Sequence, residues 1–222
     1  MELEEKELTD KNRANVFHLI GMLLQDFGDY DEALSHYQKS LEIREKIGEI
    51  KGISQSLGQI ALIYEYKGDY DQALIYFKKS IEISEKIDDI KTVSITLHNI
   101  GMIYQYKGDY DAALTQYQPS LEIKEKIGDI AGMASSMCQI GTLYLIQSQF
   151  ETALKLLLKS FAIFAKIGSP IANIVKGNIS RCREKMPEEQ FINLFACGDP
   201  GTQRVHHIYR TTASSVWEYY RG

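Results

Sequence analysis

The hexapeptide YKGDYD occupies residues 66–71 and returns unchanged at residues 106–111. A near copy, DFGDYD, occupies residues 26–31, so the three hexapeptides are spaced forty residues apart. A glycine followed by an aspartate is typical of a turn that ends one helix and caps the next. The recurrence of such a turn at a fixed spacing indicates that a whole structural unit is repeated along the chain.

The repeat extends well beyond the hexapeptide. The segment Ile60–Asn99 has a close copy in Ile100–Gln139, a third copy begins at Ile20, and a fainter one begins at Ile140. Units of this length that recur in tandem are typical of solenoids, in which each unit packs against its neighbours. We therefore expect an architecture of stacked repeats.

Each half of the unit has the apolar periodicity of a helix. Ile60, Ile63 and Tyr64 are spaced by three-residue and four-residue helical steps in the first half, as Ala73 and Phe77 are in the second. The unit is therefore predicted to be a hairpin of two helices. The glycines expected to end first helices in a left-handed conformation are Gly28, Gly68 and Gly108, and the aspartates expected to cap second helices are Asp29, Asp69 and Asp109.

Three local features refine this prediction. Asp29 and Glu32 have the spacing of a capping box at the start of a helix. Ser148 stands where the other units have the hinge glycine, so we expect the fourth turn to be set differently. Pro119 lies in the middle of a predicted helix, where it removes a backbone hydrogen bond, so we expect a kink there.

The period alone is compatible with HEAT and armadillo repeats as well as with tetratricopeptide repeats, so the residue pattern has to decide. In the third unit, Ile100, Gly101 and Tyr104 of the first helix precede Gly108 and Tyr110 of the turn. This pattern, which recurs four times, resembles the tetratricopeptide signature in its long variant, found in kinesin light chains and in spindle-orientation and G-protein-regulating adaptors. The resemblance implies an all-α fold, a right-handed superhelical α-solenoid of antiparallel helix hairpins.

The predicted domain boundaries follow where the repeat pattern begins and where it fades. It comprises an N-terminal flank (1–8), four repeats over residues 9–168 (9–48, 49–88, 89–128 and 129–168), capping helices (169–197) and a C-terminal tail (198–222). The tail changes composition abruptly and holds Trp217. It is interpreted either as a disordered extension or as a segment whose aromatic residues dock on the array.

Composition limits the class of partner. Thirty acidic and 25 basic residues give a net charge of −5, so there is no positive field to attract nucleic acid or an anionic membrane. Three widely spaced cysteines, no apolar leader and no membrane-spanning run favour a cytoplasmic location. A protein or peptide partner is expected, and pairing with a second copy of the chain remains open.

No catalytic template is present: the sequence lacks a phosphate-binding glycine loop, an HExxH motif and a nucleophile elbow. We therefore predict that the chain is not an enzyme and uses no cofactor and no metal. His98 and Cys138 occupy the same position of successive first helices, which leaves a reactive cysteine as a minor alternative to simple packing.

The resemblance implies that first helices line a concave face, and adding forty identifies equivalent positions. Amides recur there beside apolar and aromatic side chains, and an amide can both donate to and accept from the backbone of an extended peptide. The alternative interpretation is that these side chains are simply packed between helices or exposed to water. The predicted peptide-binding residues are Gln59, Asn99, Gln139, His98, Leu62, Met102, Tyr66, Tyr106, Glu65 and Gln105.

The leading hypothesis is a non-enzymatic interaction scaffold or adaptor that binds a peptide or helix of a partner in this groove. The alternative is a regulatory tetratricopeptide fragment that controls an associated signalling enzyme or transcription regulator. A clamp for acidic chaperone tails is disfavoured, because the inward positions hold no lysine or arginine, and Lys67 and Lys107 lie only at the rim.

Overall fold

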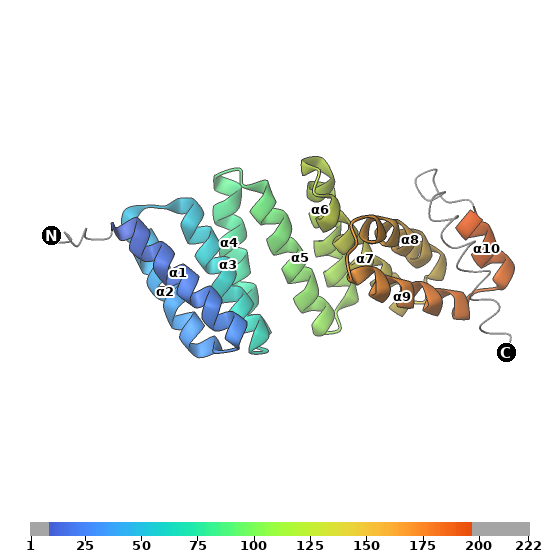
Figure 1. The fold of residues 1–222 in the computed structure, drawn as a ribbon, viewed down its shortest axis with the longest axis horizontal. Helices are drawn as coiled ribbons and strands as arrows, with labels where there is room; N and C mark the ends of the chain where they lie inside the picture. Colours follow the sequence, from blue (N-terminus) through green and yellow to red (C-terminus); the bar gives the residue numbers. More distant parts are fainter. Residues whose placement is uncertain (1–8, 197–222) are drawn as a thin grey trace, which may run out of the picture. The chain divides into compact units, whose positions relative to one another are not determined.

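The structure is a computed structural model that describes residues 9–196 of the chain. The predicted flank (1–8) and tail (198–222), including Trp217, lie outside these residues. The described part contains α-helices joined by short turns and no β-strand (Figure 1). The helices are α1 (Asp10–Phe27), α2 (Tyr30–Ile47), α3 (Ile50–Tyr66), α4 (Tyr70–Lys86), α5 (Ile90–Tyr106), α6 (Tyr110–Ile127), α7 (Ile130–Ile146), α8 (Phe150–Lys166), α9 (Ile171–Lys185) and α10 (Glu188–Ala196).

Within residues 9–196, compact packing separates a first unit that ends at Gln116 from a second unit that begins at Tyr117, so the division lies inside α6. In the first unit α1 packs on α2, α2 on α3, α3 on α4 and α4 on α5, as the blue-to-green part of Figure 1 shows. In the second unit α7 packs on α8, and α9 packs on both of them. The predicted all-α fold of consecutive helix hairpins is confirmed.

The turn within each hairpin has the backbone that the glycine pattern predicts. Gly28, Gly68 and Gly108 have φ angles of 84°, 76° and 79°, in the left-handed region that glycine adopts without steric cost. Ser148 has φ of 61° and occupies the same place in the fourth hairpin. The expectation that its turn is set differently is therefore wrong: the backbone is retained and serine adopts the left-handed conformation.

The aspartates after these glycines cap the following helices, with one exception. The Asp69 carboxylate accepts from the Gln72 backbone N–H at 3.1 Å, and Asp109 makes the equivalent bond at 3.0 Å. Asp29 makes no side-chain capping bond, so the predicted capping box with Glu32 is wrong. The backbone angles of Asp29 and Asp69 are nearly the same, so the difference lies in the side-chain torsion.

Small residues of first helices allow the large residues of second helices to approach closely. A Cβ atom added to Gly21 would lie 2.9 Å from the Tyr37 ring, and one added to Gly141 would lie 2.9 Å from Leu157. Tyr37 and Leu157 are fully buried. The glycine positions in the repeat are thus packing requirements as well as a signature.

Helices α6 and α9 complete the description of the fold. Helix α6 continues through Pro119, and a kink at that residue stays a prediction. Helix α9 buries Val175, Ile179 and Cys182 in the core shared with α8, while its other face is exposed.

Candidate peptide-binding groove

A hollow of about 390 Å³ lies in the first unit between first helices of adjacent repeats. We call it the α3–α5 pocket. Its lining residues are Leu62, Glu65 and Tyr66 of α3, Tyr70 of α4, and Asn99, Met102 and Tyr106 of α5. Six of these seven lining residues were predicted from the repeat register, and Tyr70 is the one that was not.

Helical spacing and the repeat period account for this arrangement. Leu62, Glu65 and Tyr66 are three and four residues apart and share one face of α3. Met102 and Tyr106 lie forty residues after Leu62 and Tyr66, so α5 presents the same face. The pocket is therefore lined mainly by equivalent faces of α3 and α5.

Two tyrosine pairs fix the aromatic walls of the pocket. The Tyr66 ring stacks on Tyr30 of α2 with centroids 5.5 Å apart, and the Tyr106 ring stacks on Tyr70 at 5.9 Å. Tyr66 and Tyr106 nevertheless remain 53% and 57% exposed. Each ring is thus supported from the neighbouring hairpin and still accessible to a ligand.

The two lysines at the rim are engaged with aspartates of the preceding hairpin. The Lys67 Nζ atom donates to the Asp31 carboxylate, and Lys107 donates to Asp71 at 2.8 Å. These hydrogen bonds raise the pKa of both lysines. The positive charges of these two lysines are therefore already neutralised by Asp31 and Asp71.

Glu65 supplies a carboxylate inside the pocket. It is half-buried, and burial raises the pKa of this carboxyl to about 7. Within the described residues its carboxylate makes no hydrogen bond and no ion pair. Burial, and then the charge of Glu65, raise the pKa of Tyr106, as expected if the two side chains share one site.

Two amides of the predicted groove, Gln59 and Asn99, are also unengaged within the described residues. Asn99 lines the pocket, whereas Gln59 lies half-buried one turn before Leu62 on α3 and does not line it. Neither side chain makes a hydrogen bond to the described part of the chain. Both donors and acceptors of these amides thus remain available to a ligand.

The other predicted residues lie elsewhere. His98 and Gln105 are half-buried on α5 and do not line the pocket. Gln139 lies on α7 in the second unit, so an amide ladder that continues from Asn99 stays a prediction. Cys138 is 8% exposed, and burial raises the pKa of its thiol, the opposite of the activation that a nucleophilic cysteine needs.

Sequence reasoning missed Tyr70, the pocket residue that comes from a second helix. It belongs to the repeated hexapeptide, where it was interpreted only as part of the turn. The signal was its recurrence as Tyr30 and Tyr70, each stacked on the tyrosine thirty-six residues later. Aromatic residues with that spacing indicate a contact between neighbouring hairpins.

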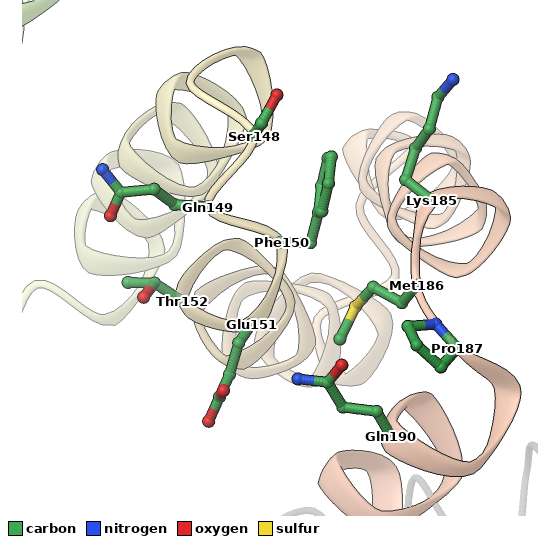
Figure 2. A pocket seen from close by; sticks show the side chains of 9 residues that line it. All are labelled: Ser148, Gln149, Phe150, Glu151, Thr152, Lys185, Met186, Pro187 and Gln190. Atoms are coloured by element: carbon green, nitrogen blue, oxygen red, sulfur yellow. The ribbon is translucent and has the colours of Figure 1, made fainter.

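A second hollow, of about 290 Å³, lies in the second unit between the α7–α8 turn and the α9–α10 turn (Figure 2). Figure 2 shows the side chains of Phe150 and Met186 between these turns, whereas Lys185 and Glu151 point away. Phe150 and Met186 pack against the hydrophobic core of the second unit. The hollow is thus the surface edge of that core, and it shares with the α3–α5 pocket the repeat position of Tyr70, occupied here by Phe150.

Comparison with known families agrees with the repeat geometry. The tetratricopeptide repeat family matches residues 12–86 and 92–166, which is more than half of the chain. The chain belongs to the tetratricopeptide repeat family. No curated protein sequence matches the chain of this tetratricopeptide repeat protein.

Solved structures show the same fold. A putative kinesin light chain from Podosopora anserina with nearly identical TPR-like repeats is 18% identical, with a TM-score of 0.65 over 85% of this chain and 97% of that one. Aspartyl phosphate phosphatase F from Bacillus subtilis is 16% identical, with a TM-score of 0.73, and 96% of this chain covers 56% of it. A Rap protein complexed with Competence and Sporulation Factor is 15% identical, with a TM-score of 0.67, and 90% of this chain covers 56% of it.

At these identities the similarity establishes the fold, including the expected likeness to kinesin light chain repeats. The chain spans little more than half the length of the last two proteins. No helix in residues 9–196 combines the length and the apolar character required to cross a membrane.

Proposed function

We propose that this tetratricopeptide repeat protein is a non-enzymatic interaction module that binds an extended segment of a partner protein across α3 and α5. The observation that carries the proposal is the α3–α5 pocket, where the unengaged Asn99 amide lies beside Leu62 and Met102. An amide of this kind can pair with a peptide backbone, and the apolar pair can receive a side chain. Stacked tyrosines then enclose the segment laterally.

Selection of binding peptides tests the proposal. The full chain is immobilised and used to enrich a displayed library of random dodecapeptides, and the affinity of the best peptide is measured by fluorescence anisotropy. Asn99→Ala and Met102→Ala should each weaken binding about tenfold, the cost typical of central contacts. Circular dichroism spectra establish that each variant remains folded.

Glu82→Ala is the matched control, because Glu82 is exposed on α4 and lies outside the pocket. Its affinity should stay within about twofold of the unmodified chain, as for peripheral surface residues. Failure to enrich any peptide, or equal affinity in all three variants, would contradict binding in the pocket.

A second candidate is a regulatory role as one part of a larger signalling assembly. It is supported by the two solved structures that extend well beyond the matched region. Co-purification of the chain with a kinase, phosphatase or transcription regulator, and a change of that enzyme's rate or of DNA binding on adding the chain, would favour it. If the chain changes neither the rate nor the DNA binding of any co-purified protein, the regulatory role is contradicted and the simple adaptor role stands.

A further inference from the structure

Charge in the α3–α5 pocket is strongly one-sided. Glu65 is the one charged residue among those that line it. The nearest lysines along the chain face other carboxylates, Lys67 with Asp31 and Lys107 with Asp71. The pocket therefore presents a half-buried carboxylate for which the described residues provide no counter-ion.

Leaving such a carboxylate without a partner is unfavourable. Desolvation destabilises the charged form, which is why the pKa of Glu65 rises to about 7. A cation placed beside the carboxylate would restore the charged form and would form a charge-assisted hydrogen bond. The site thus has more to gain from a cationic ligand than from a neutral or an anionic one.

The surrounding rings favour the same kind of ligand. Tyr66, Tyr70 and Tyr106 line the pocket beside Glu65, and aromatic faces attract an ammonium or guanidinium group through their negative quadrupole. The stacks with the neighbouring hairpins hold Tyr66 and Tyr106 in place before a ligand arrives. This arrangement reduces the ordering cost of binding.

We infer that the α3–α5 pocket is a subsite for a cationic side chain, a lysine or arginine of the bound segment, with Glu65 as its counter-ion and the three tyrosines as its walls. This inference rests on the proposed function, because it names the chemistry of the partner segment. One carboxylate is too few ligands for a tightly held metal ion. Asn99 lines the same pocket, so a neighbouring part of the bound segment can meet its amide.

The test uses the peptides selected against the full chain. Enriched sequences should share a lysine or arginine at one position, and a selection repeated against Glu65→Gln should lose that preference while it still enriches peptides. In the best peptide, lysine is replaced by norleucine, or arginine by citrulline, which removes the charge and keeps most of the shape. The unmodified chain should then lose about tenfold in affinity, as expected for a partly desolvated ion pair.

A double-mutant cycle assigns the effect to the pocket. In Glu65→Gln the neutral and cationic peptides should bind within about twofold of each other, whereas Glu82→Gln should keep the full difference. Tyr106→Leu should weaken the cationic peptide more than the neutral one, because it removes an aromatic wall.

The outcomes separate the two proposals. Peptides that depend on Asn99 and Met102 but share no cationic residue would overturn the cation subsite and leave the proposed function standing. A cationic preference that survives Glu65→Gln would also overturn it. If no peptide is enriched, or if binding ignores every pocket variant, both proposals fail together.

Discussion

At the scale of the residue, two turns hold L-amino acids in a left-handed backbone. Asp88 has φ of 54° and Ser148 has φ of 61°, where equivalent turns have glycine. Aspartate tolerates this region better than serine does, because its short polar side chain can bond locally. The turns are maintained by backbone bonds such as Gln149 N–H to the Tyr144 carbonyl oxygen at 2.8 Å. Ser148 is thus the more strained position.

Ser148→Gly should stabilise the second unit. Glycine meets no steric penalty at this φ, but it also adds freedom to the unfolded chain, so we expect a net gain of about 0.5–1 kcal/mol in the free energy of unfolding. Urea denaturation followed by circular dichroism measures it. Ser35→Gly, at an exposed position within α2, is the control and should lose a similar amount. A loss of stability in both variants would contradict strain at Ser148.

Glu65 gives the fold a pH dependence whose sign follows from its environment. The pKa of its carboxyl rises from 4.5 to about 7 on folding, so the folded chain binds this proton more tightly than the unfolded chain. The contribution to stability is complete below pH 4.5 and is lost as the pH rises through 7. The lysines that follow α3 and α5 do not offset this loss, because Lys67 pairs with Asp31 and Lys107 with Asp71.

Glu65→Gln removes this titration. At pH 8 the variant should be about 1–2 kcal/mol more stable than the unmodified chain, after allowance for the partial exposure of the side chain. At pH 4 the difference should vanish, because both forms are then neutral. Urea denaturation at the two pH values measures it, and Glu82→Gln, at an exposed site, should show no such change. Equal effects at both pH values would place Glu65 in an ordinary aqueous environment.

At the scale of the helix, one repeat position occurs in two environments. Ile63, Ile103 and Leu143 are fully buried, whereas Leu23, the equivalent residue of α1, is 59% exposed. In the first unit, Ile63 lies in a core with Ala33, Tyr37 and Ile60. Burial at this position thus comes from the preceding hairpin, which α1 does not have among the described residues.

Ile63→Ala and Leu23→Ala form a matched pair, because each shortens an aliphatic side chain at the same position of a first helix. We expect Ile63→Ala to cost about 2–4 kcal/mol, from lost burial and the cavity that remains. Leu23→Ala should cost less than about 1 kcal/mol, because little apolar surface is removed from contact. Chemical denaturation compares the two, and similar costs would show that Leu23 is covered in solution.

The hairpins could be predicted because each depends on local chemistry that the sequence displays. Gly28, Gly68 and Gly108 mark a backbone that other residues adopt at a cost, and apolar steps mark the helices on either side. The same logic misjudged Ser148, since packing of the flanking helices imposes the turn even where glycine is missing. Local preference is informative here, but the tertiary fold overrides it.

The pocket was only partly predictable. Adding forty to Leu62 and Tyr66 finds Met102 and Tyr106, because equivalent residues of stacked helices lie on one face. The contribution of Tyr70, the engagement of the rim lysines and the isolation of Glu65 depend on distances between helices. The sequence holds these residues but not the contacts between them.

At the scale of the whole molecule, the first and last helices of the described residues differ in how well their apolar side chains are covered. Helices α9 and α10 cover the apolar core of α8, which includes Leu158 and Phe161. On α1, by contrast, Leu19 and Phe27 are 58% and 81% exposed. Repeat arrays need polar outer faces at their ends to remain soluble, and α9 has one.

Shortening the chain after Gly168 should uncover the core of the second unit. Leu158 and Phe161 would lose the cover of α9, so we expect binding of an anilinonaphthalene dye and aggregation at a lower temperature. The reference is the chain shortened after Ala196, which retains both helices. Equal dye binding and equal aggregation temperatures would mean that α9 does not protect the core.

The exposed apolar face of α1, with Leu19, Leu23 and Phe27, has a practical consequence for protein engineering. A further hairpin grafted upstream in the forty-residue register would place its second helix over Leu23, which would then be buried as Ile63 and Ile103 are. The protein could in this way be extended one module at a time, and each added module would offer its own version of the tyrosine-lined recess for re-targeting.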